Sequence, residues 1–208
     1  MIHILKNNAA KRTLVLLHGT GGDEHDLVPI ARMVAPDANV LSIRGNVREN
    51  GMNRFFKRLS PGVFDLENLV DETHRLHDFI LDVMTREGLD TKNITVLGYS
   101  NGANIATSVM MFYPDVFKEA VLLRPMVPLD REPVRHEETR VLVSFGKHDP
   151  IVPRQETKRL IQKLKDMNIR VTHLDNDASH QLIKQELDAI RIWLHQDQTQ
   201  HNNQEEKR

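Results

Sequence analysis

The chain has 208 residues, 39% of them hydrophobic, which is enough for one domain with a buried core. Its 28 Lys and Arg nearly balance its 29 Asp and Glu, and a formal charge of −1 argues against nucleic acid or an anionic membrane as a partner. The absence of cysteine excludes disulfides, thiolate metal sites and a cysteine nucleophile.

The first residues resemble neither a signal peptide nor a membrane span. Lys11 and Arg12 are followed by only a short apolar run, whereas a spanning helix needs about 20 apolar residues. We therefore expect a cytoplasmic protein without membrane insertion.

Short apolar runs alternate with segments of helical period along the chain. The runs predict strands at Leu14–Leu17, Val40–Ile43, Ile94–Leu97, Ala120–Leu123, Val141–Phe145 and Arg170–Leu174. A weaker strand is predicted at Ile2–Leu5. The intervening periodic segments predict helices at Asp26–Val34, Leu69–Arg86, Asn101–Phe112, Arg154–Asp166 and Gln181–His195. This alternation indicates an α/β fold, with a mostly parallel central sheet covered by helices on both faces.

Residues 1–195 are expected to form a single domain, and the polar residues 196–208 a frayed tail. The strands and helices use most of the length, which leaves no room for a large lid domain. One long segment, Gly45–Gly62, is expected to be irregular, and long loops inside compact domains are often functional.

The strongest motif is Gly98-Tyr-Ser-Asn-Gly102, which matches G-x-S-x-G between a predicted strand and a predicted helix. In that context a sharp turn strains the serine backbone and lifts its hydroxyl out of the sheet. Small residues are needed two positions to either side of it. Ser100 is therefore the candidate nucleophile, and an ordinary glycine-rich turn is the alternative.

A serine nucleophile needs a histidine base that an acid orients, in the chain order Ser, acid, His. Asp149 follows an apolar strand and a glycine, so it is the candidate acid, and an N-cap for the next helix is the alternative. His180 lies after the last strand and is the candidate base, with His148 and His173 as rivals.

Backbone N–H groups must also stabilise the oxyanion of acyl transfer. Position predicts Asn101, directly after the nucleophile, and Thr20, in the glycine-rich loop after the first strong strand. That loop lacks the Lys-Ser/Thr and the G-x-G-x-x-G spacing of a phosphate-binding loop, so we reject a nucleotide site. No metal site is expected either, since no ligand pattern surrounds His74 and His77.

With these motifs, His18-Gly19 and Gly146–Pro153, nearly the whole chain resembles the small carboxylesterase/phospholipase family of α/β-hydrolases, which includes acyl-protein thioesterases. Arg44-Gly-Asn-Val47 and Arg54-Phe-Phe56 resemble a bacterial subgroup of that family. The resemblance implies the α/β-hydrolase fold, the roles assigned above and a homodimer. The thioesterases usually have Leu at position 20 and Gln at position 101, which weakens transfer of their lipidated-protein substrates.

These observations predict a carboxylesterase that acts on small soluble esters without a cofactor. The alternatives are a thioesterase or lysophospholipase, and a small-molecule-binding module with little turnover. The candidates to line a substrate pocket are Arg44, Met52, Phe55, Phe56, Phe64, Arg124 and Met126. The alternative is burial for the apolar side chains and a surface ion pair for the two arginines.

Overall fold

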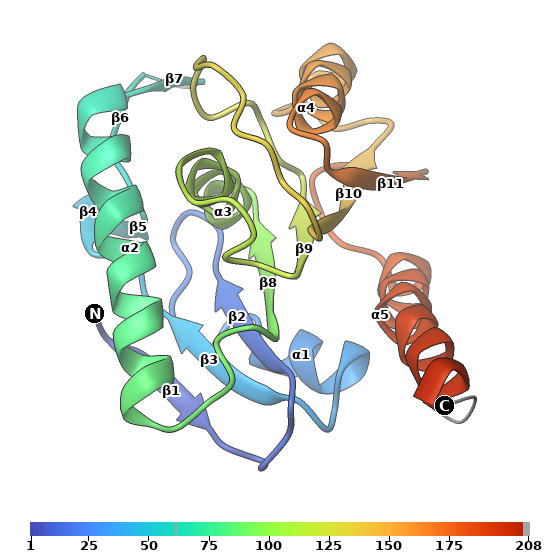
Figure 1. The fold of residues 1–208 in the computed structure, drawn as a ribbon. Helices are drawn as coiled ribbons and strands as arrows, with labels where there is room; N and C mark the ends of the chain where they lie inside the picture. Colours follow the sequence, from blue (N-terminus) through green and yellow to red (C-terminus); the bar gives the residue numbers. More distant parts are fainter. Residues whose placement is uncertain (61, 206–208) are drawn as a thin grey trace.

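A mixed sheet runs through the middle of the protein (Figure 1). The computed structural model describes residues 1–60 and 62–205. The sheet strands in chain order are β1 (His3–Lys6), β2 (Thr13–Leu17), β3 (Asn39–Ile43), β8 (Ile94–Tyr99), β9 (Glu119–Leu123), β10 (Arg140–Gly146) and β11 (Arg170–Asn176). They lie in the order β1-β3-β2-β8-β9-β10-β11, and β1 alone among them is antiparallel to its neighbour. The predicted parallel sheet is confirmed.

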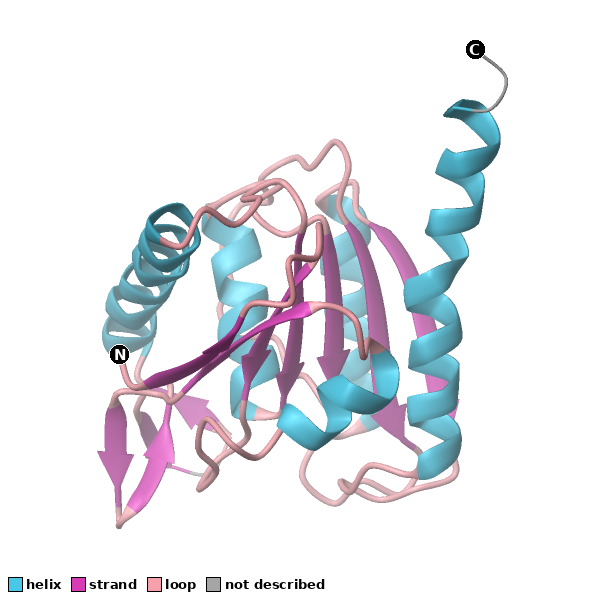
Figure 2. Ribbon diagram, turned by 90° about the horizontal axis from the view of Figure 1, so that it is seen from below, coloured by secondary structure: helices cyan, strands magenta, loops and turns pink. Residues whose placement is uncertain are grey.

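Helices cover both faces of this sheet (Figure 2). They are α1 (Val28–Val34), α2 (Leu66–Arg86), α3 (Asn101–Phe112), α4 (Arg154–Asp166) and α5 (Lys184–Glu205). Alternate β2 side chains point to opposite faces. Leu14 and Leu16 join the apolar cluster under α1 and α5, whereas Val15 and Leu17 join the cluster under α2, α3 and α4. The all-apolar strands are thus explained by burial on both sides.

Three helices differ from the predictions at their ends. Helix α1 starts at Val28, after the predicted Asp26. Helix α2 starts at Leu66, before the predicted Leu69, because the carboxylate of Asp65 caps it by accepting the Asn68 N–H at 3.1 Å. Helix α5 starts at Lys184 and continues to Glu205, through most of the stretch predicted as a frayed tail. The rest of that stretch, 206–208, lies outside the described residues.

The segment Gly45–Gly62, predicted to be irregular, instead contributes to two hairpins. Strand β4 (Val47–Glu49) pairs with β5 (Met52–Arg54), and β6 (Arg58–Ser60) pairs with β7 (Val63–Phe64). The two-residue turn of the first hairpin is Asn50-Gly51, with φ of 50° and 80°. This dipeptide suits such a turn because both positions require positive φ.

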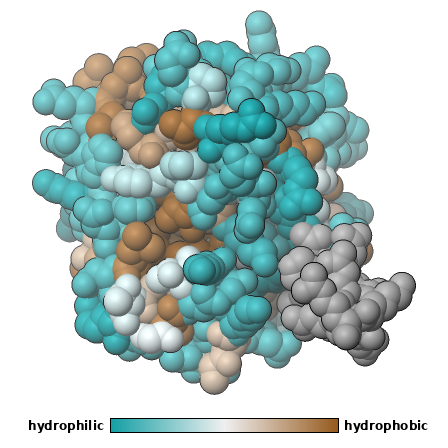
Figure 3. Space-filling model, viewed as in Figure 1, coloured by the Kyte–Doolittle hydropathy of each residue, from teal (hydrophilic) through white to brown (hydrophobic). Residues whose placement is uncertain are grey.

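The face seen in Figure 3 is largely hydrophilic, with separate hydrophobic areas. One group of exposed apolar side chains, Leu59, Val63 and Leu66, lies on the second hairpin and at the start of α2. No helix in the described ranges is long and apolar enough to cross a membrane.

Candidate active site

Ser100 lies in a strained turn between β8 and α3. Its φ of 50° and ψ of −109° are rare for a residue with a side chain. The flanking glycines allow the close packing of this turn: a Cβ on Gly102 would lie 2.0 Å from the Leu17 carbonyl oxygen, and one on Gly98 would lie 2.6 Å from the Gly102 carbonyl oxygen. The observed geometry is that of a nucleophile elbow.

Asp149 and His180 form a hydrogen-bonded pair on neighbouring loops that follow β10 and β11. His180 Nδ1 lies 2.7 Å from Asp149 Oδ2, and the Asp149 side chain is only 1% exposed. The other carboxylate oxygen accepts the N–H groups of Ile151 and Val152 at 2.8 and 3.0 Å. The carboxylate is thereby fixed and can orient the imidazole.

The other candidate bases lie elsewhere. His148 is on the surface, where its Nε2 contacts Asp177 at 2.8 Å, and His173 is an exposed residue of β11. By contrast, the ring of His180 lies 5.4 Å from the ring of Tyr99, the residue before the candidate nucleophile. The structure therefore brings His180 to Asp149 and to Tyr99, the neighbour of Ser100 in the chain.

The two amides proposed for the oxyanion have no acceptor among the described residues. Within residues 1–60 and 62–205, neither the Thr20 N–H nor the Asn101 N–H makes a hydrogen bond. The Asn101 amide opens helix α3, where the first N–H groups have no partner inside the helix. The loop after β2 and the start of α3 thus leave two donors free for a ligand.

The first hairpin holds the loop that carries Thr20. The Gly21 N–H donates to the Asn53 carbonyl at 2.9 Å, and the Asn53 side-chain amide donates to the Gly22 carbonyl at 2.9 Å. Arg54, which is buried, donates from Nη1 to the Thr20 hydroxyl at 2.6 Å. Burial lowers the pKa of the Arg54 guanidinium.

The same segment reaches the second amide and the base of the loop. The Phe55 N–H donates to Asn101 Oδ1 at 2.7 Å, and the Gly45 N–H donates to His18 Nε2 at 3.0 Å. His18 Nδ1 lies 2.6 Å from the Gly19 carbonyl, so the proton sits on Nδ1. Burial lowers the pKa of His18, which favours this neutral form.

The structure corrects four of the residues predicted to line a pocket. Phe55 and Phe56 are fully buried in the apolar core, because they pack beneath the hairpins. Arg124 is also fully buried, in an ion pair with Glu186. Arg44 forms an ion pair with Glu24, with Nη2 at 2.8 Å from Oε1, which is the alternative given for it above.

The remaining three pocket candidates are partly exposed. Met52 would lie 3.7 Å from a Cβ on Gly21 and so borders the loop of Thr20. The Met126 N–H donates to Asn104 Oδ1 at 2.8 Å, which ties it to the first turns of α3. Phe64 stacks edge-on against Phe56 at 5.1 Å, so much of its ring is used in packing.

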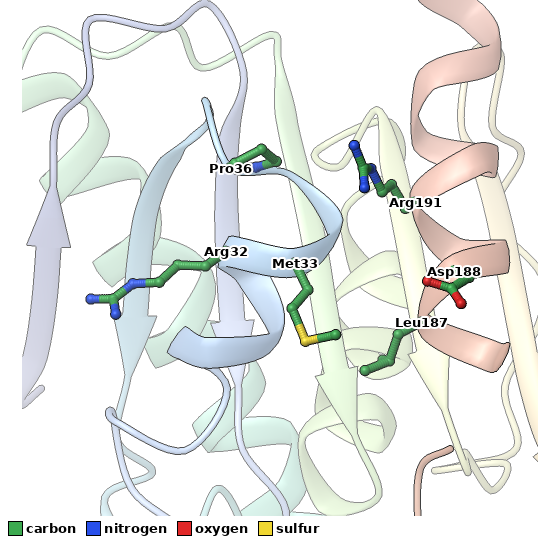
Figure 4. Close-up of a pocket in the computed structure, with 6 residues that line it drawn as sticks. All are labelled: Arg32, Met33, Pro36, Leu187, Asp188 and Arg191. Atoms are coloured by element: carbon green, nitrogen blue, oxygen red, sulfur yellow. The ribbon is translucent and has the colours of Figure 1, made fainter. Parts of the chain in front are cut away.

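A separate surface cavity lies between α1 and α5 (Figure 4). Its volume is about 240 Å³, and its lining consists of Arg32, Met33, Pro36, Leu187, Asp188 and Arg191. It shares no residue with the elbow or with the Asp149–His180 pair. It holds no serine, histidine or cysteine that could act as a nucleophile, so we assign it no part in the chemistry.

Sequence reasoning overlooked three side chains that support the site: Arg54, Tyr99 and Glu186. Tyr99 donates its hydroxyl to the His180 carbonyl at 3.1 Å, and burial raises the pKa of this phenol. Glu186 stands in the sequence as an acidic residue at the start of a helix. Nothing in the sequence distinguishes its buried carboxylate from a carboxylate exposed to solvent.

A sheet with a strained serine elbow, an Asp–His pair and two free amides at the carboxyl ends of its strands defines an α/β-hydrolase. The model of the phospholipase/carboxylesterase family matches residues 4–197, and the chain belongs to that family of carboxylic ester hydrolases. It is similar to MhqD of Bacillus subtilis (strain 168), named as a hydrolase, with 42% identity over 93% of this chain and 97% of MhqD.

Solved structures support the same fold and family. The Bacillus cereus carboxylesterase is 40% identical, with a TM-score of 0.90 over 92% of each chain. YahD, solved with malic acid, is 35% identical, with a TM-score of 0.88 over 94% of this chain and 98% of YahD. SOBER1 of Arabidopsis thaliana, at 21% identity, supports the fold alone, with a TM-score of 0.77 over 90% of this chain and 99% of SOBER1.

Proposed function

We propose that the protein hydrolyses small carboxylic esters through a serine nucleophile. Ser100 attacks the carbonyl carbon, His180 acts as the base and Asp149 orients and stabilises it. The observation that carries this proposal is the 2.7 Å contact between His180 and the buried side chain of Asp149. His180 also contacts Tyr99, which directly precedes the strained Ser100. This combination matches the roles of a catalytic triad.

In the first half of the reaction, the Ser100 Oγ–H proton passes to His180 Nε2 as Oγ bonds to the ester carbon. The carbonyl oxygen becomes an oxyanion, which the N–H groups of Thr20 and Asn101 stabilise. The ester C–O bond then breaks, and the alcohol leaves with the proton from His180. An acyl group remains on Ser100.

In the second half, water replaces the alcohol. His180 accepts one proton of the water while its oxygen attacks the acyl carbon, and the same two amides stabilise the new oxyanion. The bond to Ser100 Oγ breaks, Oγ recovers the proton, and the carboxylic acid is released. Asp149 keeps its charge throughout and stabilises the imidazolium in both halves.

Two observations favour small esters. Within the described residues every helix packs on the sheet or on another helix, so no helical lid covers a long acyl chain (Figures 1 and 2). In addition, YahD has been solved with malic acid, a small carboxylic acid of the class that such hydrolysis releases.

The proposal is tested by mass spectrometry after exposure to a fluorophosphonate, which labels activated serines. We expect a single adduct on Ser100, none in Ser100→Ala and slower labelling in His180→Ala. Turnover of acetyl to octanoyl esters should fall by about 10⁴-fold or more in Ser100→Ala. Folded wild-type protein that takes no label would contradict the proposal.

Paired oxygen esters and thioesters of each acyl length then distinguish the activities within the family. Faster turnover of short oxygen esters supports the proposal. Preference for long acyl thioesters would identify a thioesterase. Tight ligand binding that survives Ser100→Ala without wild-type turnover would identify a binding module.

A further inference from the structure

A fully buried ion pair lies behind the loop that carries His180. Arg124, directly after β9, contacts Glu186 in the first turn of α5, with Nη1–Oε1 at 2.7 Å and Nη2–Oε2 at 3.0 Å. Both side chains have zero exposure. Desolvation largely cancels the attraction in such pairs, and apolar replacements are often as stable. A contribution to stability therefore does not explain the pair, and a role in positioning is the alternative.

The remaining donors of Arg124 hold the backbone on either side of the base. Nε donates to the Ser179 carbonyl at 3.1 Å, and Nη2 donates to the Gln181 carbonyl at 2.7 Å. The carbonyl between them, that of His180, accepts the Tyr99 hydroxyl. Three successive carbonyls of this loop are therefore fixed by side chains, and two of them depend on one guanidinium.

The sheet in turn fixes Arg124. Its N–H donates to the Ser144 carbonyl at 2.8 Å, although its φ of 55° is unfavourable for a residue with a side chain. The Ser144 hydroxyl contacts both Arg124 Nη1 and the Glu186 carboxylate. A planar fork with donors at three nitrogens can make all these contacts at once, and a lysine cannot.

We propose that Arg124, oriented by Glu186, is a positioning residue that holds the His180 loop so that the imidazole stays on Asp149 and within reach of Ser100. This inference rests on the proposed function for its effect on turnover. The contacts predict that the ion pair acts on the geometry of the base and not on the binding of the ester.

The test compares Arg124→Lys and Glu186→Gln with Glu119→Gln. Glu119 is the matched control because it lies at the other end of β9, is 3% exposed and pairs with Arg140 at 2.6 Å. All three variants should melt at lower temperature. At a temperature where each is folded, Arg124→Lys and Glu186→Gln should lower kcat about 10²-fold with little change in KM, as expected for a small displacement of a reacting group. Glu119→Gln should keep wild-type kcat.

A second readout does not depend on turnover: the proton NMR signal of the His180 Nδ1–H that bonds to Asp149, assigned by its loss in His180→Ala. We expect this signal to weaken in Arg124→Lys and to persist in Glu119→Gln. A wild-type protein that shows the signal but hydrolyses no ester would overturn the proposed function. A weaker signal in Arg124→Lys would then still support the positioning role. Wild-type signal and kcat in folded Arg124→Lys, or equal losses in Glu119→Gln, would overturn the positioning role.

Discussion

A methyl group at Gly146 should disable the site without touching any reacting atom. A Cβ built on Gly146 would lie 2.2 Å from the Ser179 carbonyl oxygen and 2.5 Å from the Ala178 carbonyl oxygen. Both atoms belong to the backbone just before His180. To restore a separation of 3.0 Å, the loop must move by about 0.8 Å from the first contact alone.

A displacement of that size moves the imidazole relative to Ser100. A misplacement of about 1 Å costs about 10²-fold in rate, which is roughly 2.7 kcal/mol of barrier height. We therefore expect Gly146→Ala to lower kcat on a short ester about 100-fold and to slow fluorophosphonate labelling of Ser100 in proportion. KM should change little, since the residues proposed to contact the ester lie on other loops.

Gly88→Ala is the control. Gly88 has φ of 64° and no heavy atom within 4 Å of an added Cβ, so its alanine variant suffers backbone strain of about 1 kcal/mol without a clash. It should melt earlier yet keep wild-type kcat. Wild-type kcat in Gly146→Ala would refute the reasoning, because the loop would then tolerate the shift without loss of alignment.

Two other substitutions test the support of the site. Arg54→Lys should lower kcat about 10-fold by loosening Thr20, which is a smaller loss than the 10²-fold or more for removing an oxyanion donor. The control Arg48→Lys, at an exposed position, should keep wild-type kcat. Equal kcat in the two variants would show that Arg54 does not position the Thr20 loop. His18 is buried and its folded pKa lies below the ordinary 6.5, so the folded state binds fewer protons and the free energy of unfolding should fall as the pH drops below about 6.5. In urea titrations from pH 5 to 8, His18→Asn should reduce the dependence of the free energy of unfolding on pH. The dependence that remains comes from the buried His136, whose pKa is also lowered by burial. An unchanged pH dependence would contradict the lowered pKa of His18.

The sheet and the elbow are accessible from sequence because they depend on local patterns. Buried parallel strands need uninterrupted apolar runs, and the turn at Ser100 needs small residues at positions 98 and 102. The hairpin at residues 47–54 has a turn signal in Asn50-Gly51, but its short strands are too polar to be recognised as strands, so this segment was predicted to be irregular.

The partners of charged residues are what the sequence does not reveal. Arg124 and Arg44 both follow strands and both suggested contacts with a polar substrate. One is buried against Glu186, which is 62 residues away in the chain, and the other pairs with Glu24 near the surface. Such pairings depend on how α5 and the loop after β2 pack, which no local pattern specifies.

The hydrogen-bond ladder of the sheet continues past its strand ends into the site. The Ser100 N–H donates to the Leu123 carbonyl, the Arg124 N–H donates to that of Ser144, and the Lys147 N–H donates to that of Asn176. We therefore expect the Ser100 amide to exchange with solvent only when neighbouring strands separate, as slowly as amides of the core. The candidate nucleophile is thus anchored in the part of the protein that should open last on heating.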